Sequence, residues 1–147
     1  MVKAIKALGL DMKASNGDGM VYELNKEYIH DGDVKCRLSG YHYFDSIRNV
    51  MTLYNLNESR LFECELNGEV FDHNGIVHCT NKIKLVREIS KEEIKKYIED
   101  NIDKLVNDED WRVRIKLAND KDRDVRKEVS RQLKLRNNKE NLLVLSM

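Results

Sequence analysis

Short runs of alternating apolar and polar residues fill the first part of the chain, and turn residues separate them. A period of two is typical of strands with one buried face, and it is clearest at Arg60–Leu66 and Lys82–Ile89. Gly, Asn and Asp gather between the runs, where tight turns require them. The pattern predicts a mainly antiparallel sheet with strands over residues 2–8, 21–24, 28–30, 34–38, 40–44, 60–66, 69–71, 76–79 and 82–89.

A single helix interrupts this strand pattern. Asp45 stands where an N-cap accepts hydrogen bonds from free backbone amides. Apolar residues then recur at helical spacing, at Ile47, Val50, Met51 and Tyr54. We therefore expect residues 1–89 to form one α+β domain, in which this helix packs against the sheet.

The pattern changes at Ser90. Ser90 and Glu93 form a capping box, which marks the start of a helix. An apolar stripe at helical spacing follows it, at Ile94, Tyr97, Ile98, Ile102 and Leu105. We expect residues 90–147 to form a helical C-terminal region.

A repeat with a period of twelve follows. Asn107–Ala118 and Asn119–Ser130 carry Asn, Asp, Asp and Val-Arg at the same offsets. Each unit begins with acidic residues, which the helix macrodipole favours at an N-terminus, and continues as a short helix. A short helix cannot bury its apolar face alone, so the repeat predicts that neighbouring helices stack.

This motif is similar to the short helical units of the HEAT-like and variant leucine-rich repeat families, over about residues 100–136. The resemblance implies that Arg114 and Arg126 pair with the neighbouring acidic residues Asp108, Asp110, Asp120 or Asp122. The predicted fold class is therefore α+β, a mainly antiparallel sheet with one packed helix, followed by a short all-helical HEAT-like tail.

Composition limits the function classes. The chain has 26 basic and 26 acidic residues, so it carries no overall charge that would draw it to nucleic acid or to an anionic membrane. Its three cysteines lack the spacing of a disulfide framework or a zinc site, which indicates a reducing compartment. No stretch approaches the roughly 20 apolar residues of a membrane span. We expect a cytoplasmic protein with no membrane partner.

The segment Gly40–Phe44 is the best candidate for chemistry. Its histidine, His42, lies between Tyr41 and Tyr43, and such an imidazole can bind a nucleotide or exchange a proton near neutral pH. Alternation puts both tyrosines on one face and His42 on the other with Phe44, where hydrogen-bonded core histidines are common. Both interpretations stay open.

Residues 2–89 resemble an uncharacterised domain of phage and prophage proteins. The resemblance rests on the strand Val2–Leu8, the Gly-aromatic-His-aromatic segment with its helix at Gly40–Tyr54, the strand ending in Gly-Glu-Val at Arg60–Val70, and the strand Lys82–Ile89. It implies a phage or mobile-element context and no particular activity.

The same aromatic segment, its helix and the strand after it are also similar to the central part of ADP-ribosyltransferases. This resemblance implies that His42 or Tyr43 stacks on nicotinamide and that Glu65 or a neighbouring carboxylate, Glu63 or Glu69, assists. The chain lacks the His-Gly or Arg-Gly pair that the first strand of that family carries.

Metal and cofactor sites are not predicted. Asp72, His73, His78 and Cys79 match no ligand spacing of zinc sites. The acidic residues of the repeat lack the glycine and the closing glutamate of a calcium-binding EF-hand loop.

The C-terminal region predicts a partner. Lys121–Lys139 holds eight Lys or Arg against three Asp or Glu, and Leu142–Leu145 is an apolar run that must dock somewhere. Our first hypothesis is a phage or mobile-element accessory protein without catalysis, which binds a host defence or regulatory protein or a second copy of itself. A nucleic acid is a further candidate, and the alternative function is a nucleotide-binding or ADP-ribosyltransferase-like domain. The expected partner contacts are Trp111, Arg123, Arg126, Lys127, Arg131 and Lys134.

Overall fold

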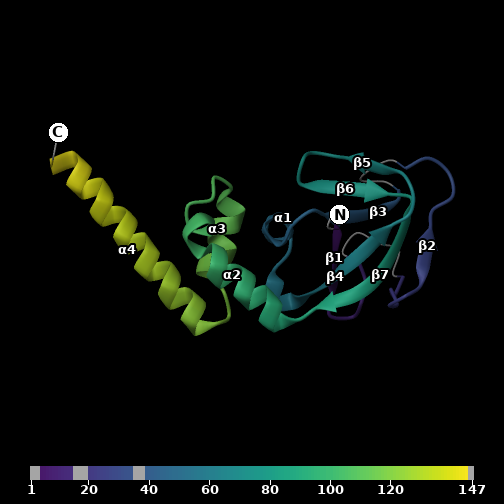
Figure 1. Ribbon diagram of the computed structural model, residues 1–147, viewed down its shortest axis with the longest axis horizontal. Helices are drawn as coiled ribbons and strands as arrows, with labels where there is room; N and C mark the ends of the chain where they lie inside the picture. Colours follow the sequence, from purple (N-terminus) through teal and green to yellow (C-terminus); the bar gives the residue numbers. More distant parts are fainter. Residues whose placement is uncertain (1–3, 15–19, 35–38, 146–147) are drawn as a thin grey trace. The chain divides into compact units, whose positions relative to one another are not determined.

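The computed structural model describes residues 4–14, 20–34 and 39–145. The chain forms two compact units, Met1–Ile94 and Lys95–Met147. The first unit holds a β-sheet, and the second is built from helices (Figure 1). The sequence pattern predicts this division between residues 89 and 90.

The sheet has seven strands, and every neighbouring pair is antiparallel. Its order is β2-β7-β4-β1-β3-β6-β5, so the first strand of the chain lies in the centre. The strands are β1 (Ala4–Gly9), β2 (Glu27–Ile29), β3 (Tyr41–Phe44), β4 (Ser59–Leu66), β5 (Val70–Asp72), β6 (Val77–Thr80) and β7 (Lys82–Ile89).

Two of the predicted strands do not appear among the strands that the structure describes. Residues 21–24 form only isolated bridges, between Val21 and Lys13 and between Leu24 and Leu85. The predicted strand 34–38 lies mostly outside the described residues.

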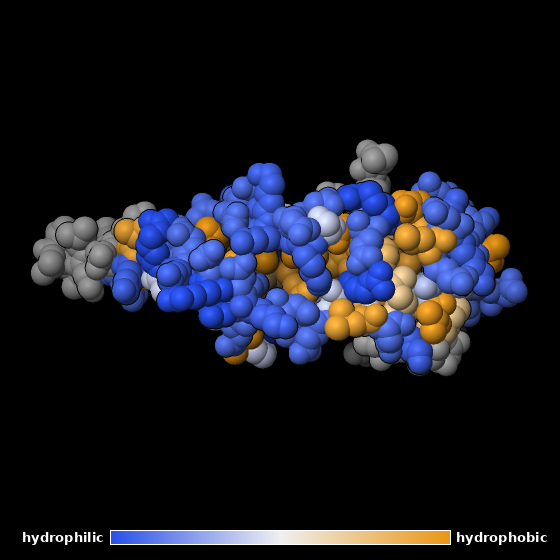
Figure 2. All heavy atoms as spheres, turned by 90° about the horizontal axis from the view of Figure 1, so that it is seen from below, coloured by the Kyte–Doolittle hydropathy of each residue, from blue (hydrophilic) through white to orange (hydrophobic). Residues whose placement is uncertain are grey.

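A core cluster of the first unit lies on one face of the sheet. Apolar side chains of β1, β4 and β7 meet there with Tyr22, Tyr28 and Tyr43, and Met12, Ala14 and Met20 pack against them from the segment after β1. Phe62 is fully buried in this cluster. The face shown in Figure 2 is mostly hydrophilic, and hydrophobic side chains reach it in several places.

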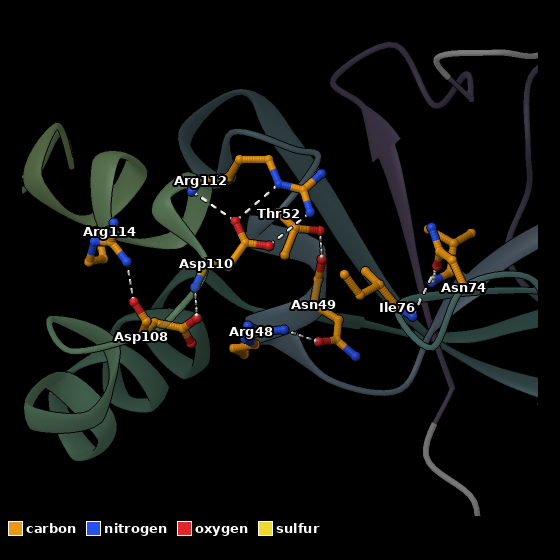
Figure 3. A network of polar contacts seen from close by, with 10 residues as sticks. Arg48, Asn49, Thr52, Asn74, Ile76, Asp108, Asp110, Arg112 and Arg114 are labelled. Carbon is orange, nitrogen blue, oxygen red and sulfur yellow. Dashed lines mark hydrogen bonds and ion pairs between the residues drawn. The ribbon is translucent and has the colours of Figure 1, made fainter.

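Helix α1 (Ile47–Met51) packs next to β3 and buries Ile47, Val50 and Met51. Its N-cap is Ser46, whose side chain accepts a hydrogen bond from the Asn49 amide at 3.1 Å, so the predicted cap at Asp45 is wrong. The helix also ends earlier than predicted, because the Thr52 hydroxyl donates to the Asn49 carbonyl at 2.7 Å and the last turn tightens (Figure 3).

Helix α2 (Lys91–Leu105) begins directly after β7, and its first turn is bonded to the sheet unit. Arg87 of β7 donates to both carboxylate oxygens of Glu93, at 2.7 and 2.9 Å. The Lys91 ammonium donates to the carbonyls of Leu56, in the 3₁₀ helix η1 (Leu56–Glu58), and of Ser59, at 2.8 and 2.6 Å. The capping box of Ser90 and Glu93 forms as predicted.

The predicted fold class is therefore wrong beyond its α+β class. The sheet is accompanied by α1, η1 and the first turn of α2, rather than by one packed helix followed by an all-helical tail. Side-chain bonds to β7 and η1 hold the start of α2 in the first unit. The spacing of apolar residues along the sequence does not reveal these bonds.

The second unit contains the rest of α2, then α3 (Trp111–Ala118) and α4 (Arg123–Leu145). The twelve-residue repeat appears as a repeated loop in front of α3 and α4. Asp108 and Asp120 each accept a hydrogen bond from the amide two residues later, at 2.9 and 2.8 Å. Asp110 and Asp122 do the same, at 2.9 and 2.8 Å, at the start of each helix.

The arginines of the repeat close these loops. Arg114 donates to the main-chain carbonyl of Asp108 (Figure 3). Arg126 donates in the same way to the carbonyl of Asp120, so neither arginine pairs with the acidic side chains that the repeat resemblance implies. The helices that follow the two repeated loops differ in length, since α3 has 8 residues and α4 has 23. Within the part of the chain that the structure describes, none of the helices is long and apolar enough to cross a membrane.

Candidate functional site

The three residues of the nucleotide-binding hypothesis do not converge. His42 and Tyr43 are neighbours on β3, so their side chains point to opposite faces of the sheet. Glu65 lies on β4, and β1 runs between β3 and β4. Topology thus separates the imidazole and the carboxylate that an ADP-ribosyltransferase-like site would bring together.

His42 lies near the only deeply buried lysine among the described residues, Lys6. The Lys6 ammonium, on central strand β1, donates to the His42 carbonyl at 2.7 Å and lies 5.2 Å from the centre of the Tyr22 ring. Burial lowers the pKa of Lys6 to about 8, and burial followed by the charge of Lys6 also lowers the pKa of His42. Lys6 thus still carries its charge at neutral pH, although less firmly than an exposed lysine, while His42 is shifted toward its neutral form.

Cys64 lies on the neighbouring strand, where it is the residue paired with Ala4 of β1. Burial raises the pKa of this free thiol to about 12, so it is a poor nucleophile at neutral pH. Sequence reasoning missed Lys6. Its signal was a lysine between Ala4 and Leu8, the apolar residues two positions away on the same face of the strand.

Tyr43 belongs to a second polar cluster, around His78 of β6. The two rings are stacked with their centres 5.3 Å apart. The His78 Nδ1 atom lies 3.2 Å from Asp72 Oδ1, and its Nε2 atom lies 2.7 Å from Asp45 Oδ2 without hydrogen-bond geometry. His78 of β6 therefore lies between Asp72 of β5 and Asp45 in the turn before α1, a position that gives it a structural role.

Among the residues that the structure describes, no group of three or more His, Cys, Asp and Glu side chains is arranged to hold a metal ion. Cys79 is disulfide-bonded, so the sequence-based expectation of reduced cysteines is wrong for this residue.

The second unit carries a hollow apolar surface, which we call the apolar groove. It has a volume of about 380 Å³ and lies between α3 and α4. Trp111 is 62% exposed and Ile115 is 50% exposed, although both are large apolar residues. The lining residues are Val106, Trp111, Arg114, Ile115, Leu117, Ala118, Val129 and Leu133.

The groove arises because α3 is apolar on two sides. Val113 and Leu117 are four residues apart and fully buried, so they form the side that holds the helix in its unit. Trp111 and Ile115 have the same spacing and lie on the other side. Sequence reasoning named Trp111 and missed Ile115 and Leu133, for which the signal was the spacing of four residues from Trp111 and from Val129.

A second hollow of about 490 Å³ follows α4, and we call it the basic surface. Its lining residues are Arg123, Arg126, Lys127, Ser130, Arg131 and Lys134. These include all five basic residues that the sequence assigns to a partner. Adjacent residues on a helix are about 100° apart, so Ser130 and Lys134 stand directly beside Val129 and Leu133 of the apolar groove.

The basic residues differ in how they are engaged. Arg131 is paired with Glu128, and Arg126 donates to the carbonyls of Asp120 and Lys121 at 2.7 and 3.0 Å. The charges of Arg123, Lys127 and Lys134 are not paired with any residue that the structure describes. They form an unbalanced positive strip along α4.

Comparison with known proteins identifies the first unit. Residues 2–97 match the profile of a family described as Domain of unknown function (DUF7666). A comparison with curated proteins finds no match. The match confirms the predicted resemblance to an uncharacterised domain, while the phage context stays a prediction. Because the matched residues make up more than half of the sequence, the chain belongs to the DUF7666 family.

Proposed function

We propose that the protein acts by binding another protein, and that the apolar groove of α3 and α4 is its binding surface. The observation that carries the proposal is the exposure of Trp111 and Ile115 on a helix whose opposite side is already buried. A helix with apolar residues on two sides needs two partners to cover it. The described part of the chain supplies one of them.

The energetics favour a binding role for this surface. An aromatic residue that becomes buried at an interface is a frequent hot spot, and its truncation commonly costs about 2 kcal/mol or more of binding free energy. Contiguous exposed apolar side chains beside a charged rim are also typical of interaction sites. A role as an accessory protein of a phage or mobile element, directed at a host protein, is part of this proposal and rests on the sequence resemblance alone.

Site-specific photo-crosslinking tests the proposal. A photoreactive residue is placed at Ile115, in the groove, and in a second protein at Ile29, which is 58% exposed on edge strand β2 of the first unit. We expect a discrete crosslinked product in cell lysate from position 115 and none from position 29. The product is expected to decrease at least about tenfold when Trp111→Asp is added.

Two outcomes would count against this function. Equal products at both positions would show nonspecific capture, and the absence of any product from position 115 would contradict the proposal. A crosslink between two copies of the purified protein would identify self-association instead of a foreign partner.

A further inference from the structure

We infer that the occupant of the apolar groove is an amphipathic helix of another protein, with acidic residues along the side that faces the basic surface of α4. This inference rests on the proposed function and specifies its partner. Three observations support it. Three basic residues of α4 have no paired charge among the described residues, the backbone of the groove walls is already hydrogen-bonded within the helices, and a symmetric dimer would bring like charges to one interface.

Several other cations of the second unit are paired with acidic side chains. Arg112 folds back on Asp110, with a closest distance of 2.8 Å (Figure 3), and Lys95 pairs with Asp122 at 3.0 Å. Against this background, Arg123, Lys127 and Lys134 point their charges to one side of α4, at spacings of four and seven residues. Complementary charge on a partner steers association and fixes its orientation. The strip therefore selects a negative partner.

The shape of the partner follows from the groove walls. Both walls are helices, whose main-chain amides and carbonyls are bonded within the helix. An extended peptide needs backbone partners such as a sheet edge, and these walls offer none. An amphipathic helix satisfies its own backbone and presents apolar side chains at i, i+3, i+4 and i+7 to such a groove.

A second copy of the chain is the poorer occupant. A two-fold symmetric dimer brings the same surface of both copies together, so the strips of Arg123, Lys127 and Lys134 from both copies would add positive charge to one interface without adding negative charge. Like charges that meet at an interface disfavour association. A nucleic acid would satisfy the strip but leave the aliphatic part of the groove, Ile115 and Leu133, without a matching surface.

Three synthetic helical peptides test the inference. They share one apolar face and differ only on one flank, which carries Glu, Gln or Lys. Binding to the full chain is followed through the emission of Trp111, because the chain has one tryptophan and it lines the groove. We expect the Glu peptide to shift the emission to the blue and to bind at least tenfold more tightly than the Gln peptide at low salt. Added salt is expected to reduce this preference.

A matched pair of variants locates the effect. The triple variant Arg123→Gln, Lys127→Gln, Lys134→Gln should abolish the preference for Glu and leave affinity for the Gln peptide within about threefold, because the apolar contacts persist. The control removes the same charge elsewhere in the second unit, through Lys96→Gln, Lys104→Gln and Lys121→Gln, and should bind like the wild type.

The outcomes separate this inference from the proposed function. Equal binding of the Glu and Gln peptides would overturn the acidic partner and leave the groove as a binding surface. Failure of all three peptides would overturn both. Competition by a single-stranded oligonucleotide that depends on the three basic residues, without binding of the Glu peptide, would assign the strip to phosphates and overturn the inference.

Discussion

Apolar side chains are buried differently in the central strand of the sheet unit and in α3 of the helical unit. In the sheet unit, the central strand β1 has neighbours on both sides, and the side chains of Leu8, Phe62 and Leu85 are fully buried. In the helical unit, α3 buries one side and exposes the other. The exposed side lies outside residues 2–97, which the family profile covers. The sheet unit also exposes single apolar side chains, such as Ile29 and Val70, but the proposed binding groove lies in the region that follows the family domain.

The largest expected effect contrasts an aromatic residue of each unit. Phe62→Ala removes a fully buried ring and leaves a cavity, so we expect it to lower the free energy of unfolding by about 3–5 kcal/mol. Trp111→Ala removes an exposed ring and should change it by less than about 1 kcal/mol. Urea unfolding followed by circular dichroism measures both. A comparable loss in Trp111→Ala would mean that the groove is already filled from within the chain.

A second pair of substitutions makes the same comparison within α3. Leu117→Ala deletes a fully buried side chain and should destabilise the second unit by about 2–5 kcal/mol. Ile115→Ala acts on the half-exposed side and should cost less than about 1 kcal/mol. Thermal unfolding at the helical band of the circular dichroism spectrum checks this pair. Similar losses would show that α3 has no free side.

Sequence reasoning succeeded where one short stretch of residues determines the structure. The alternation at 60–66 and 82–89 corresponds to β4 and β7, and Ser90 with Glu93 caps α2. The repeated aspartates mark the starts of α3 and α4, because each acts on amides only two residues away. These are local interactions, and a local pattern contains them.

Sequence reasoning failed where the structure depends on contacts between strands that are far apart in the sequence. Nothing in the sequence places β1 between β3 and β4, and this order separates His42 from Glu65. The choice of Ser46 over Asp45 as the cap depends on backbone conformation rather than on residue type, since both side chains accept hydrogen bonds. For the binding surface, the sequence named Trp111 and the basic residues of α4. The groove itself depends on which side of α3 is buried, and helical spacing alone does not decide that.

The third prediction concerns a charge inside the sheet unit. Lys6 has a pKa of about 8 in the folded protein and a usual value of 10.5, so the unfolded chain binds more protons between these pH values. Stability must then rise with pH in this window, by at most about 1.4 kcal/mol per pH unit, and the cost of burying the charge is fully present below pH 8. We expect the unfolding free energy of the wild type to rise relative to that of Lys6→Met between pH 8 and pH 10.

Cys64 is the control for this experiment. Burial raises the pKa of its thiol to about 12, so its ionisation in the unfolded chain lowers stability as pH rises above the usual value of 9. The comparison is therefore repeated in a Cys64→Ala background, where the contribution of Lys6 should stand alone. A pH-independent difference in that background would show that the Lys6 ammonium keeps its usual pKa in the sheet.

The smallest effect is expected at the exposed ion pair that connects β7 with α2. Hydrogen bonds from Arg87, and then from the Ser90 amide, hold the pKa of Glu93 down to about 2. Its contribution to stability is present above pH 4.5 and is lost as the pH falls toward 2, but water screens the pair because both side chains are nearly half exposed. Glu93→Gln keeps the capping box and removes only the charge, so it should slightly flatten the acid side of the stability profile. Glu99→Gln, further along α2, is the control and should not change that slope. A pronounced loss of stability at neutral pH in Glu93→Gln would contradict this prediction, since an exposed ion pair contributes little.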